Sequence, residues 1–367
     1  MFKESRVKVL IVTGESGGHI FPAVSFAETL KNKHNQINIL LVLPKKSIKN
    51  FVLPTGCSIK YLSILPIKLG LNLRTVAAIF GFIKGVFESL FLLVEFRPNY
   101  VVGFGSINSV PLLFFAWIFR IRTLIHEQNV IPGRANRFLA KFMDKVAISF
   151  AETRNYLKVD PKKIALTGNP VRKDLVRVDK LQALSFFGFS KEKFTVLVMG
   201  GSKGAHKINT AFLYAASIME RNYDLQVIHI AGQDDYNFLK VSYKDSNANA
   251  RLFIFLKEMQ YAYSSVDLVI SRAGATTLAE LIAYKLPAII IPYPFAFQHQ
   301  LSNAKILGQL GSAIIINDSD LDANLLKKIL EELINNPDKL QIMRSSYNNI
   351  SADNANELLE NALLSLN

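Results

Sequence analysis

One stretch of the sequence decides the fold: SRAGATTLAELIAYKLPAIIIPYPFAFQHQLSN, which occupies Ser271–Asn303. The apolar run Val266–Ile270 before it is a predicted buried strand, the next four residues are small or polar, and a helix is expected from about Ala275. A second apolar strand is predicted over Ala288–Ile291, where two following prolines end it. A strand, a tight turn, a helix and a second strand form the repeating unit of a parallel α/β sheet.

Polar and small residues in this stretch indicate a ligand site. The turn Ser271–Gly274 precedes the helix, so free N–H groups and the positive end of the helix dipole can hold an anion. Glu280 in that helix would repel phosphate but can accept hydrogen bonds from two hydroxyls of a ribose. The loop after the second strand is expected to carry His299 and Gln300, which suit a sugar. An ordinary strand–helix crossover with no ligand has the same sequence pattern. The rest of the chain must therefore distinguish a ligand site from a purely structural unit.

Three more glycine-rich turns follow predicted strands. They are Gly14–His19 after Val7–Thr13, Gly103–Ser106 after Tyr100–Val102, and Gly200–Ala205 after Thr195–Met199. Glycine lets a backbone approach a phosphate or sugar and tolerates positive φ. The first turn has neither the spacing of a dinucleotide fingerprint nor the closing residues of a P-loop. The last suits phosphate best, because it combines successive N–H groups, the Ser202 hydroxyl and a helix N-terminus.

Two further groups of side chains are candidates for chemistry. His19, at the first turn, can accept a proton near neutral pH, although a histidine that only caps the helix would occupy the same place. Four polar residues, His126–Asn129, follow the predicted strand Thr123–Ile125. Because ligands of open α/β sheets bind at the carboxyl ends of strands, these four can hold a polyhydroxy substrate.

The chain of 367 residues is long enough for two α/β domains. Gly168–Arg172 marks the predicted boundary, and Pro170 stiffens it. The first domain is therefore predicted at residues 1–167 and the second at 168–349. A last helix, at about residues 350–367, is expected to cross back onto the first domain.

Composition limits the class of protein. Half of the residues are hydrophobic, which favours a folded core over disorder. The single cysteine, Cys57, excludes a disulfide framework or a cysteine-based zinc site and fits a reducing, cytosolic setting. The N-terminal apolar run is short and leads into a glycine turn, unlike a secretory signal. Thr75–Val94 contains Lys84 and Glu88, and Val110–Phe119 is too short for a core of about 30 Å, so neither is expected to span a membrane.

The positive charge is concentrated in the first half. Residues 1–167 contain 23 Lys and Arg against 9 Asp and Glu, and so hold the whole net charge of +14. No acidic residue lies between Glu28 and Glu88. An anionic membrane and a nucleic acid both attract such a surface. The intervening residues are mainly Leu, Ile, Phe and Val rather than spaced stacking aromatics, which favours lipid.

With these motifs in order, the sequence resembles the MurG family of N-acetylglucosamine transferases nearly from end to end. The motifs that carry the resemblance are Gly17–Ala23, His126–Asn129 with Ile131–Gly133, Gly168–Arg172, Gly200–Ala205, Ser271–Ala275 with Glu280, and His299–Gln300 with Asn303–Ala304. The chain departs from the family in the first turn, where Glu15 and Ser16 replace the usual Gly and Thr. In the second turn Ser106 and Ile107 replace the usual Gly and Tyr.

The resemblance implies a GT-B fold, in which two Rossmann-like, doubly wound parallel-sheet domains are separated by a cleft. It implies transfer of N-acetylglucosamine from UDP-N-acetylglucosamine to the 4-hydroxyl of the muramyl pentapeptide of undecaprenyl-diphosphate-linked lipid I, which gives lipid II. Such transfer would invert the anomeric carbon and need no metal or other cofactor. Because the acceptor is lipid-linked, the protein would be peripheral on the cytoplasmic face of the plasma membrane. Its expected partners are both substrates and an anionic membrane surface, not nucleic acid.

The resemblance also implies roles for residues. The candidate donor-binding residues are Ser16, Gly17, Gly18, Asn129, Arg172, Ser202, Leu256, Met259, Ala275, Glu280, His299 and Gln300. The candidate acceptor-binding residues are Gly14, Gly17, Gly18, Gly103, Gly105 and Ser106. His19 is the first candidate for the base, and Glu127 is the second, either as base or as orienter of His19.

Two rival interpretations remain open at this level. Another GT-B enzyme, such as a non-hydrolysing sugar-nucleotide epimerase or a glycolipid synthase, would share most of the motifs. A membrane- or RNA-binding protein on a degenerate transferase scaffold would account for Glu15 and Ser106.

Overall fold

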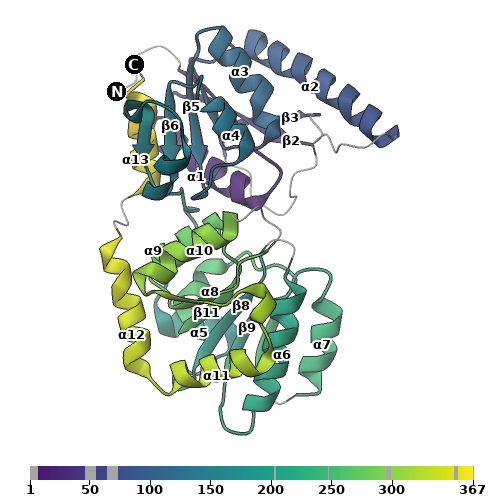
Figure 1. Cartoon of the computed structure of the whole chain (residues 1–367), viewed down its shortest axis with the longest axis vertical. Helices are drawn as coiled ribbons and strands as arrows, with labels where there is room; N and C mark the ends of the chain where they lie inside the picture. The colour runs from purple at the N-terminus through teal and green to yellow at the C-terminus, as the bar shows by residue number, and fades with distance from the viewer. Residues whose placement is uncertain are drawn as a thin grey trace. The chain divides into compact units, whose positions relative to one another are not determined.

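The computed structural model describes residues 7–45, 55–63, 73–201, 204–246, 248–294, 299–350 and 354–366, with side chains from residue 81 onward in the helix that begins at Leu73 (Figure 1). The chain forms two compact units. One comprises Met1–Arg172 with Asp353–Asn367, and the other comprises Lys173–Ala352.

The first unit is built on a parallel sheet in the order β3-β2-β1-β4-β5-β6-β7. Its described strands are β1 (Lys8–Val12), β2 (Asn38–Pro44), β3 (Ser58–Leu62), β4 (Tyr100–Gly103), β5 (Arg122–Glu127), β6 (Lys145–Ile148) and β7 (Ile164–Leu166). Its described helices are α1 (Gly17–Lys33), α2 (Leu73–Phe96), α3 (Val110–Ile118), α4 (Arg134–Leu139) and α13 (Ala355–Leu364), with 3₁₀ turns at Ile107–Ser109, Ala151–Tyr156 and Pro161–Lys163. Strand order reverses between β1 and β4, which is the topological switch point where such sheets bind ligands.

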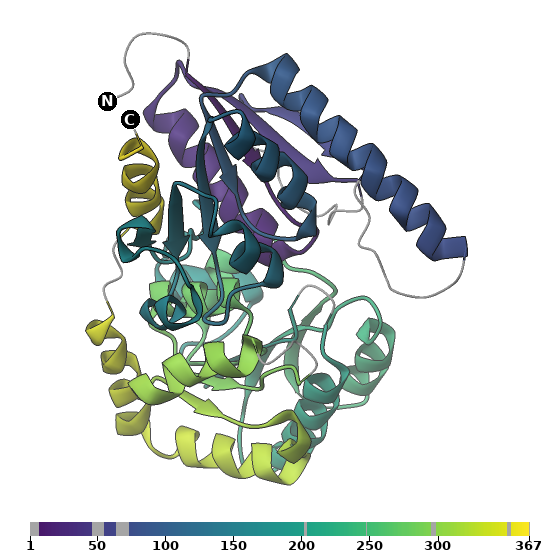
Figure 2. The same cartoon turned by 45° about the horizontal axis from the view of Figure 1, so that its top comes forward.

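Alternating side chains of the first sheet face two helical layers. On β1, Val9 and Ile11 pack with α1 and α13, whereas Leu10 and Val12 pack with α2, α3 and α4. Figure 2 shows α2 and α3 side by side and α13 against the other layer. Among the described residues, no helix is both long and apolar enough to span a membrane.

Helix α13 belongs to the first unit although it ends the chain. Lys33 of α1 lies 2.9 Å from the Glu357 carboxylate, and the His34 ring lies 2.6 Å from that of Glu360. The Asn356 amide donates to the Ser25 hydroxyl at 3.0 Å. These contacts and the apolar face of α13 attach the C-terminal helix to α1.

The second unit repeats the arrangement with a parallel sheet in the order β10-β9-β8-β11-β12-β13. Its described strands are β8 (Thr195–Met199), β9 (Gln226–Ile230), β10 (Asn249–Phe253), β11 (Leu268–Ser271), β12 (Ala288–Ile290) and β13 (Ala313–Ile315). Its described helices are α5 (Lys180–Phe187), α6 (His206–Met219), α7 (Tyr236–Lys244), α8 (Met259–Ser265), α9 (Ala275–Tyr284), α10 (His299–Leu310), α11 (Ala323–Ile334) and α12 (Pro337–Ser346), with 3₁₀ turns at Asp318–Asp320 and Tyr347–Asn349. Here the switch point lies between β8 and β11.

Three elements differ from the sequence-based expectations. The sequence predicts a helix from about Pro22 to Lys33, because proline is common at a helix start. Helix α1 instead begins at Gly17: Pro22 lies inside it, and the N–H groups of His19 and Ile20 already donate to the Ser16 carbonyl. Strand β5 continues through Glu127, so the polar run begins within the strand. His299 starts α10, so it and Gln300 lie in a helix rather than in a loop.

Candidate functional site

In the first unit, the loops after β1 and β4 meet at the switch point. A side chain at Gly14 would place its Cβ 2.6 Å from the Cβ of Ser106 and 2.8 Å from Nδ1 of His19, so only glycine fits. Gly103 ends β4, and a Cβ there would overlap Leu113 of α3, so its need for glycine comes from packing. These contacts bring the first two glycine-rich turns of the sequence to one place.

Ser106 has an unusual backbone. Its φ of 75° and ψ of 155° lie in a region that is nearly restricted to glycine, and the preceding Gly105 also has a positive φ of 87°. This is one of the positions where the resemblance noted in the sequence implies glycine. The chain therefore keeps a glycine-like turn beside His19 at a cost in conformational energy.

His19 lies in the first turn of α1, next to Gly17 and Gly18. The N–H groups of those two glycines belong to the helix start, where no carbonyl of the helix can accept them. The His19 Nδ1 atom is 2.9 Å from the Ser16 hydroxyl, and the ring edge with Nε2 lies beside Gly105. When Nδ1 donates its proton to Ser16, Nε2 is left with a lone pair that can accept one.

Burial lowers the pKa of His19 to about 4. The imidazole is therefore neutral at pH 7, where it can accept a proton, but it is a weaker base than a solvated histidine. Sequence reasoning expected proton acceptance near neutral pH and could not see this desolvation.

Glu127 is buried, and its carboxylate accepts four hydrogen bonds. The Asn129 N–H and side-chain amide donate to Oε1 at 2.9 and 3.2 Å. The Gly133 N–H and the Asn136 amide donate to Oε2 at 3.0 and 2.8 Å. Both oxygens thus hold the segment from Asn129 to Asn136 in place. Asn136 was missed by sequence reasoning, because nothing in the local pattern shows that its amide reaches Glu127.

His126 is a buried neighbour with a defined tautomer. Its Nε2 lies 2.9 Å from the Gly168 carbonyl, to which it donates, and its Nδ1 accepts from the Gln128 amide at 3.2 Å. Burial lowers its pKa to about 4, although the bond to Gly168 opposes that shift. The histidine therefore connects β5 to the junction segment. Arg172, at the end of that segment, places its guanidinium 5.1 Å from the Phe21 ring.

In the second unit, the turn after β8 is packed too tightly for side chains at two glycines. A Cβ at Gly200 would lie 2.2 Å from the Ala205 nitrogen, and a Cβ at Gly204 would lie 2.3 Å from the Ala231 carbonyl oxygen. Gly201 instead faces open space and has a φ of 89°. Ser202, a predicted donor-binding residue, lies outside the described residues. The turn leads directly into α6.

The turn after β11 lies beside this one, because β8 and β11 are neighbours. Gly274 caps α9, Ala275 is its first residue, and both precede the helix's free N–H groups. Glu280 is buried in α9, where its Oε2 accepts a 2.7 Å hydrogen bond from the Tyr263 hydroxyl. Leu256 and Met259 are buried in the same core, so only their backbone can face a base.

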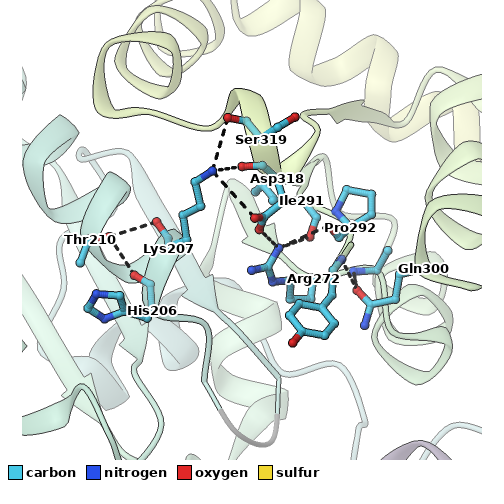
Figure 3. Close-up of polar contacts among 11 residues, drawn as sticks. His206, Lys207, Thr210, Arg272, Ile291, Pro292, Gln300, Asp318 and Ser319 are labelled. Atoms are coloured by element: carbon cyan, nitrogen blue, oxygen red, sulfur yellow. Dashed lines mark hydrogen bonds and ion pairs between the residues drawn. The ribbon is translucent and has the colours of Figure 1, made fainter. Parts of the chain in front are cut away.

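Arg272 does not point into solvent but joins several loops, as Figure 3 shows. Its Nη1 donates to the Ile291 and Pro292 carbonyls at 3.1 and 3.4 Å and to the carboxylate of Asp318. Lys207, in the first turn of α6, binds the Asp318 carbonyl and lies 3.8 Å from its carboxylate. Asp318 therefore joins the loops after β11 and β13 to the helix that follows the glycine turn, and Arg272 adds the loop after β12.

Gln300 is a second tie among these loops. Its Oε1 accepts from the Ala273 N–H at 3.2 Å and from the Tyr293 N–H at 2.9 Å. The Asn303 amide, one turn along α10, donates to the Ala273 carbonyl at 3.2 Å. His299 is part-buried in the first turn of α10. The start of α10 thus fixes the turn before α9.

The described residues contain no group of three or more His, Cys, Asp or Glu side chains that could hold a metal ion. The site residues fall into two sets. Gly14, Ser16, Gly17, Gly18, His19, Gly103, Gly105, Ser106, Glu127, Asn129 and Arg172 belong to the first unit, and Leu256, Met259, Ala275, Glu280, His299 and Gln300 belong to the second.

Comparison with known proteins gives matches in both units. Residues 9–148 match the glycosyltransferase family 28 N-terminal domain, and residues 195–359 match the glycosyltransferase family 28 C-terminal domain. The chain is 36% identical over 367 residues to the UDP-N-acetylglucosamine–N-acetylmuramyl-(pentapeptide) pyrophosphoryl-undecaprenol N-acetylglucosamine transferase of Thermoanaerobacter sp. (strain X514), covering 98% of this chain and 100% of that one. The transferase of the same name from Halothermothrix orenii is 35% identical over 349 residues, with 93% and 94% covered.

Among solved structures, Acinetobacter baumannii MurG matches with a TM-score of 0.77 at 24% sequence identity, covering 98% of this chain and 99% of that one. This likeness concerns the fold. Together with the two doubly wound parallel sheets, it confirms the predicted GT-B fold class.

Proposed function

The chain belongs to the MurG family of glycosyltransferases, and from that premise we infer that it transfers N-acetylglucosamine from UDP-N-acetylglucosamine to lipid I and so forms lipid II. The observation that carries this function is the identity of 36% with a named transferase over the full length of both chains. Each of the two sheets has a switch point, where sheets of this kind bind ligands, and a glycine turn lies at each. One switch point suits a donor site and the other an acceptor site.

The activity is tested with purified protein, UDP-N-acetylglucosamine and a lipid I analogue. Formation of the disaccharide–lipid product and of UDP in equal amounts is the expected result. Conversion of the nucleotide sugar without any acceptor would instead identify an epimerase. The anomeric configuration of the product tests the proposed inversion, since direct displacement on an α-linked donor gives a β-linkage.

We propose that the second unit binds the donor. The N–H groups at the start of α9 and of the Gly200–Ala205 turn suit the diphosphate, and Glu280 suits the ribose. The backbone of Leu256 and Met259 would face the uracil, and His299 with Gln300 the sugar. Asn129, Arg172, Ser16 and Ser202 are proposed to complete donor binding.

We propose that the acceptor hydroxyl is deprotonated by His19, beside the predicted acceptor residues Gly14, Gly105 and Ser106. The neutral ring and its bond to Ser16 support this role, because a base must hold a lone pair at working pH. General-base catalysis contributes about 10²–10⁴-fold to the rate, and the loss of turnover in His19→Ala is expected on that scale. Turnover should fall while UDP binding, measured calorimetrically, is unchanged. Unchanged turnover would remove His19 from the mechanism.

Glu127 is better suited to positioning than to proton transfer. Its two oxygens already accept four N–H bonds, and removing its charge would release the segment that contains Asn129. Glu127→Gln should therefore raise the KM for the donor as well as lower kcat. A pure loss of kcat with the acidic limb of the pH profile abolished would assign the base to Glu127 instead.

We propose that the first unit docks on an anionic membrane through a surface formed by α2, α3 and α4. Helices α2 and α3 pack together. The large apolar side chains exposed on this surface are Ile83, Phe87, Phe91 and Val94 of α2, Trp117 and Ile118 of α3 with Phe119 just after it, and Phe138 of α4. Exposed cations adjoin them in the chain, namely Lys84, Arg120, Arg134, Arg137 and Lys141. Apolar side chains that insert at the interface and cations that meet lipid phosphates suit a peripheral protein on the cytoplasmic leaflet.

Vesicle sedimentation tests the docking surface. Phe87 and Phe91 are each 65% exposed, so replacing both with Ser removes apolar surface without opening the core. We expect binding to phosphatidylglycerol vesicles to fall at least tenfold, and to fall with salt. The matched control is Val241→Ser with Ile342→Ser, because these residues are equally exposed in the second unit. Equal losses in both variants would contradict the assignment.

A further inference from the structure

A cavity of about 350 Å³ lies in the second unit among α5, α8, α9 and α12. The residues that line it and matter here are Arg177, Lys180, Tyr263, Asp267, Tyr284 and Arg344. Asp267 directly precedes β11, so the cavity lies toward the amino-terminal end of that strand. The glycine turn and the start of α9 follow the carboxyl ends of β8 and β11. The cavity is therefore not part of the proposed diphosphate site.

The cavity has more positive than negative charge in its wall. Asp267 is the one acidic residue among those that line the cavity, and its carboxylate is already engaged: Lys180 lies 2.7 Å from Oδ1, and the Thr195 N–H donates to Oδ2 at 3.0 Å. Arg344 lies 3.9 Å from Oδ1 and donates to the Asp267 carbonyl at 3.1 Å. No carboxylate of the described residues lies within 4.0 Å of Arg177. Asp267 thus pairs with Lys180 and Arg344 but not with Arg177.

The two guanidinium groups influence each other across this space. Burial lowers the pKa of Arg344, Asp267 raises it, and the positive charge of Arg177 lowers it again. Arg177 is held near the cavity by a 3.3 Å bond to the Ala283 carbonyl and lies 5.6 Å from the Tyr284 ring. Arg344 is part-buried, whereas Arg177 and Lys180 are exposed. The like charges of Arg177 and Arg344 repel each other, and an anion bound between them would offset that repulsion.

We propose that this cavity binds a small phosphate-bearing anion through Arg177, Lys180 and Arg344. The planar guanidinium fork matches two phosphate oxygens at once, and the ammonium adds a point charge. A neighbouring cavity of about 770 Å³ shares Lys180, Asp267 and Arg344. A substituent carried by the phosphate therefore has room beyond the cation cluster.

The cavity adjoins a residue of the proposed donor site. The Tyr263 ring lines the cavity, and its hydroxyl donates to Glu280 at 2.7 Å. Tyr284, also in the wall, ends the helix that carries Glu280 and packs 5.2 Å from Tyr263 between ring centroids. An anion in the cavity would therefore change the setting of Glu280 and with it the affinity for the donor. This coupling, but not anion binding itself, rests on the proposed function.

Calorimetry with inorganic pyrophosphate tests the site. The full-length protein is first saturated with UDP, so that the donor's phosphate seat is occupied, and ionic strength is held constant with chloride. We expect a second, pyrophosphate site whose Kd rises at least tenfold in Arg177→Gln and in Arg344→Gln. The matched control is Lys240→Gln, which removes one exposed positive charge of α7 outside the cavity. Absence of binding, or equal binding in all four proteins, would overturn the proposal.

Further arms define the ligand and the coupling. Arg177→Lys keeps the charge without the fork, so an intermediate Kd supports phosphate recognition, whereas wild-type affinity would contradict it. Inorganic phosphate and N-acetylglucosamine 1-phosphate distinguish a bare phosphate from a substituted one. Pyrophosphate should shift the KM for UDP-N-acetylglucosamine in the wild type but less in Tyr263→Phe. Failure of UDP to bind would refute the donor site, while variant-dependent pyrophosphate binding would still support the cavity.

Discussion

Replacement of Asp318 by Asn tests whether one carboxylate holds the loops of the donor site. Asp318 receives Arg272 from the loop after β11 and Lys207 from the start of α6 (Figure 3). Asn keeps the size of the side chain and one acceptor oxygen but removes the charge. The loops after β11 and β13 would then lose their ion pair, while Arg272 keeps its two carbonyl partners in the loop after β12.

The magnitude follows from burial. The side chains of Arg272 and Asp318 are 11% and 18% exposed, so solvent screens their attraction only in part. Breaking a fully buried pair costs about 3–5 kcal/mol, and an exposed pair contributes about 0–1 kcal/mol. With a neutral acceptor retained, we expect a loss of about 1–2 kcal/mol. For a domain of this size, that corresponds to a fall in Tm of about 2–8 °C.

Calorimetric melting and steady-state kinetics measure the two consequences. We expect the KM for UDP-N-acetylglucosamine to rise about 3–10-fold, on the scale of 1.4 kcal/mol per factor of ten, with kcat changed less. Asp320→Asn is the control: it lies two residues away, and its carboxylate accepts only local bonds from Asn317 and Ser319. A wild-type KM in Asp318→Asn, or the same change in Asp320→Asn, would refute the reasoning.

Three other predictions concern the turns. The pKa of His19, about 4, lies below the ordinary value of 6.5, so the ring stays a neutral base as the pH falls. We therefore expect kcat/KM to decline only as the pH passes through about 4. An acidic limb near 6.5 in the pH–rate profile would contradict this. Gly204→Ala should destabilise the second unit far more than Gly201→Ala in urea titrations, because only the former meets a backbone oxygen. Ser106→Gly should stabilise the protein by about 1–3 kcal/mol by removing strain, and an unchanged urea midpoint would disprove the strain.

The strands and glycine turns could be predicted from sequence because their determinants are local. The runs Val7–Thr13 and Thr195–Met199 are rich in β-branched and apolar residues, and each is followed by a glycine whose role depends on backbone geometry. Helix boundaries were harder. Pro22 suggested a helix start although one more turn precedes it, and the polar residues His299 and Gln300 suggested a loop although they begin α10. In both cases the residue types indicated a helix boundary at a position where the backbone hydrogen bonds show none.

The polar networks could not be predicted, because their partners are distant in sequence. The four bonds to Glu127 and the bond from Tyr263 to Glu280 depend on how helices pack against strand ends. The cations of the cavity come from α5, α12 and the segment before α5, and no motif marks them. Desolvation of His19 is likewise a property of packing. Sequence could identify candidate residues but not the protonation or the partners that define their roles.

The two units show why a glycine turn alone does not specify chemistry. Gly14 and Gly204 are both required by close packing at a switch point, so each would be kept whatever bound there. The difference lies in the side chains that follow. In the first unit the turn places His19 as a neutral ring, whereas in the second Lys207, which follows Gly204, is bound to Asp318. The first turn can therefore exchange a proton, while the second presents N–H groups whose positions are held by surrounding ion pairs.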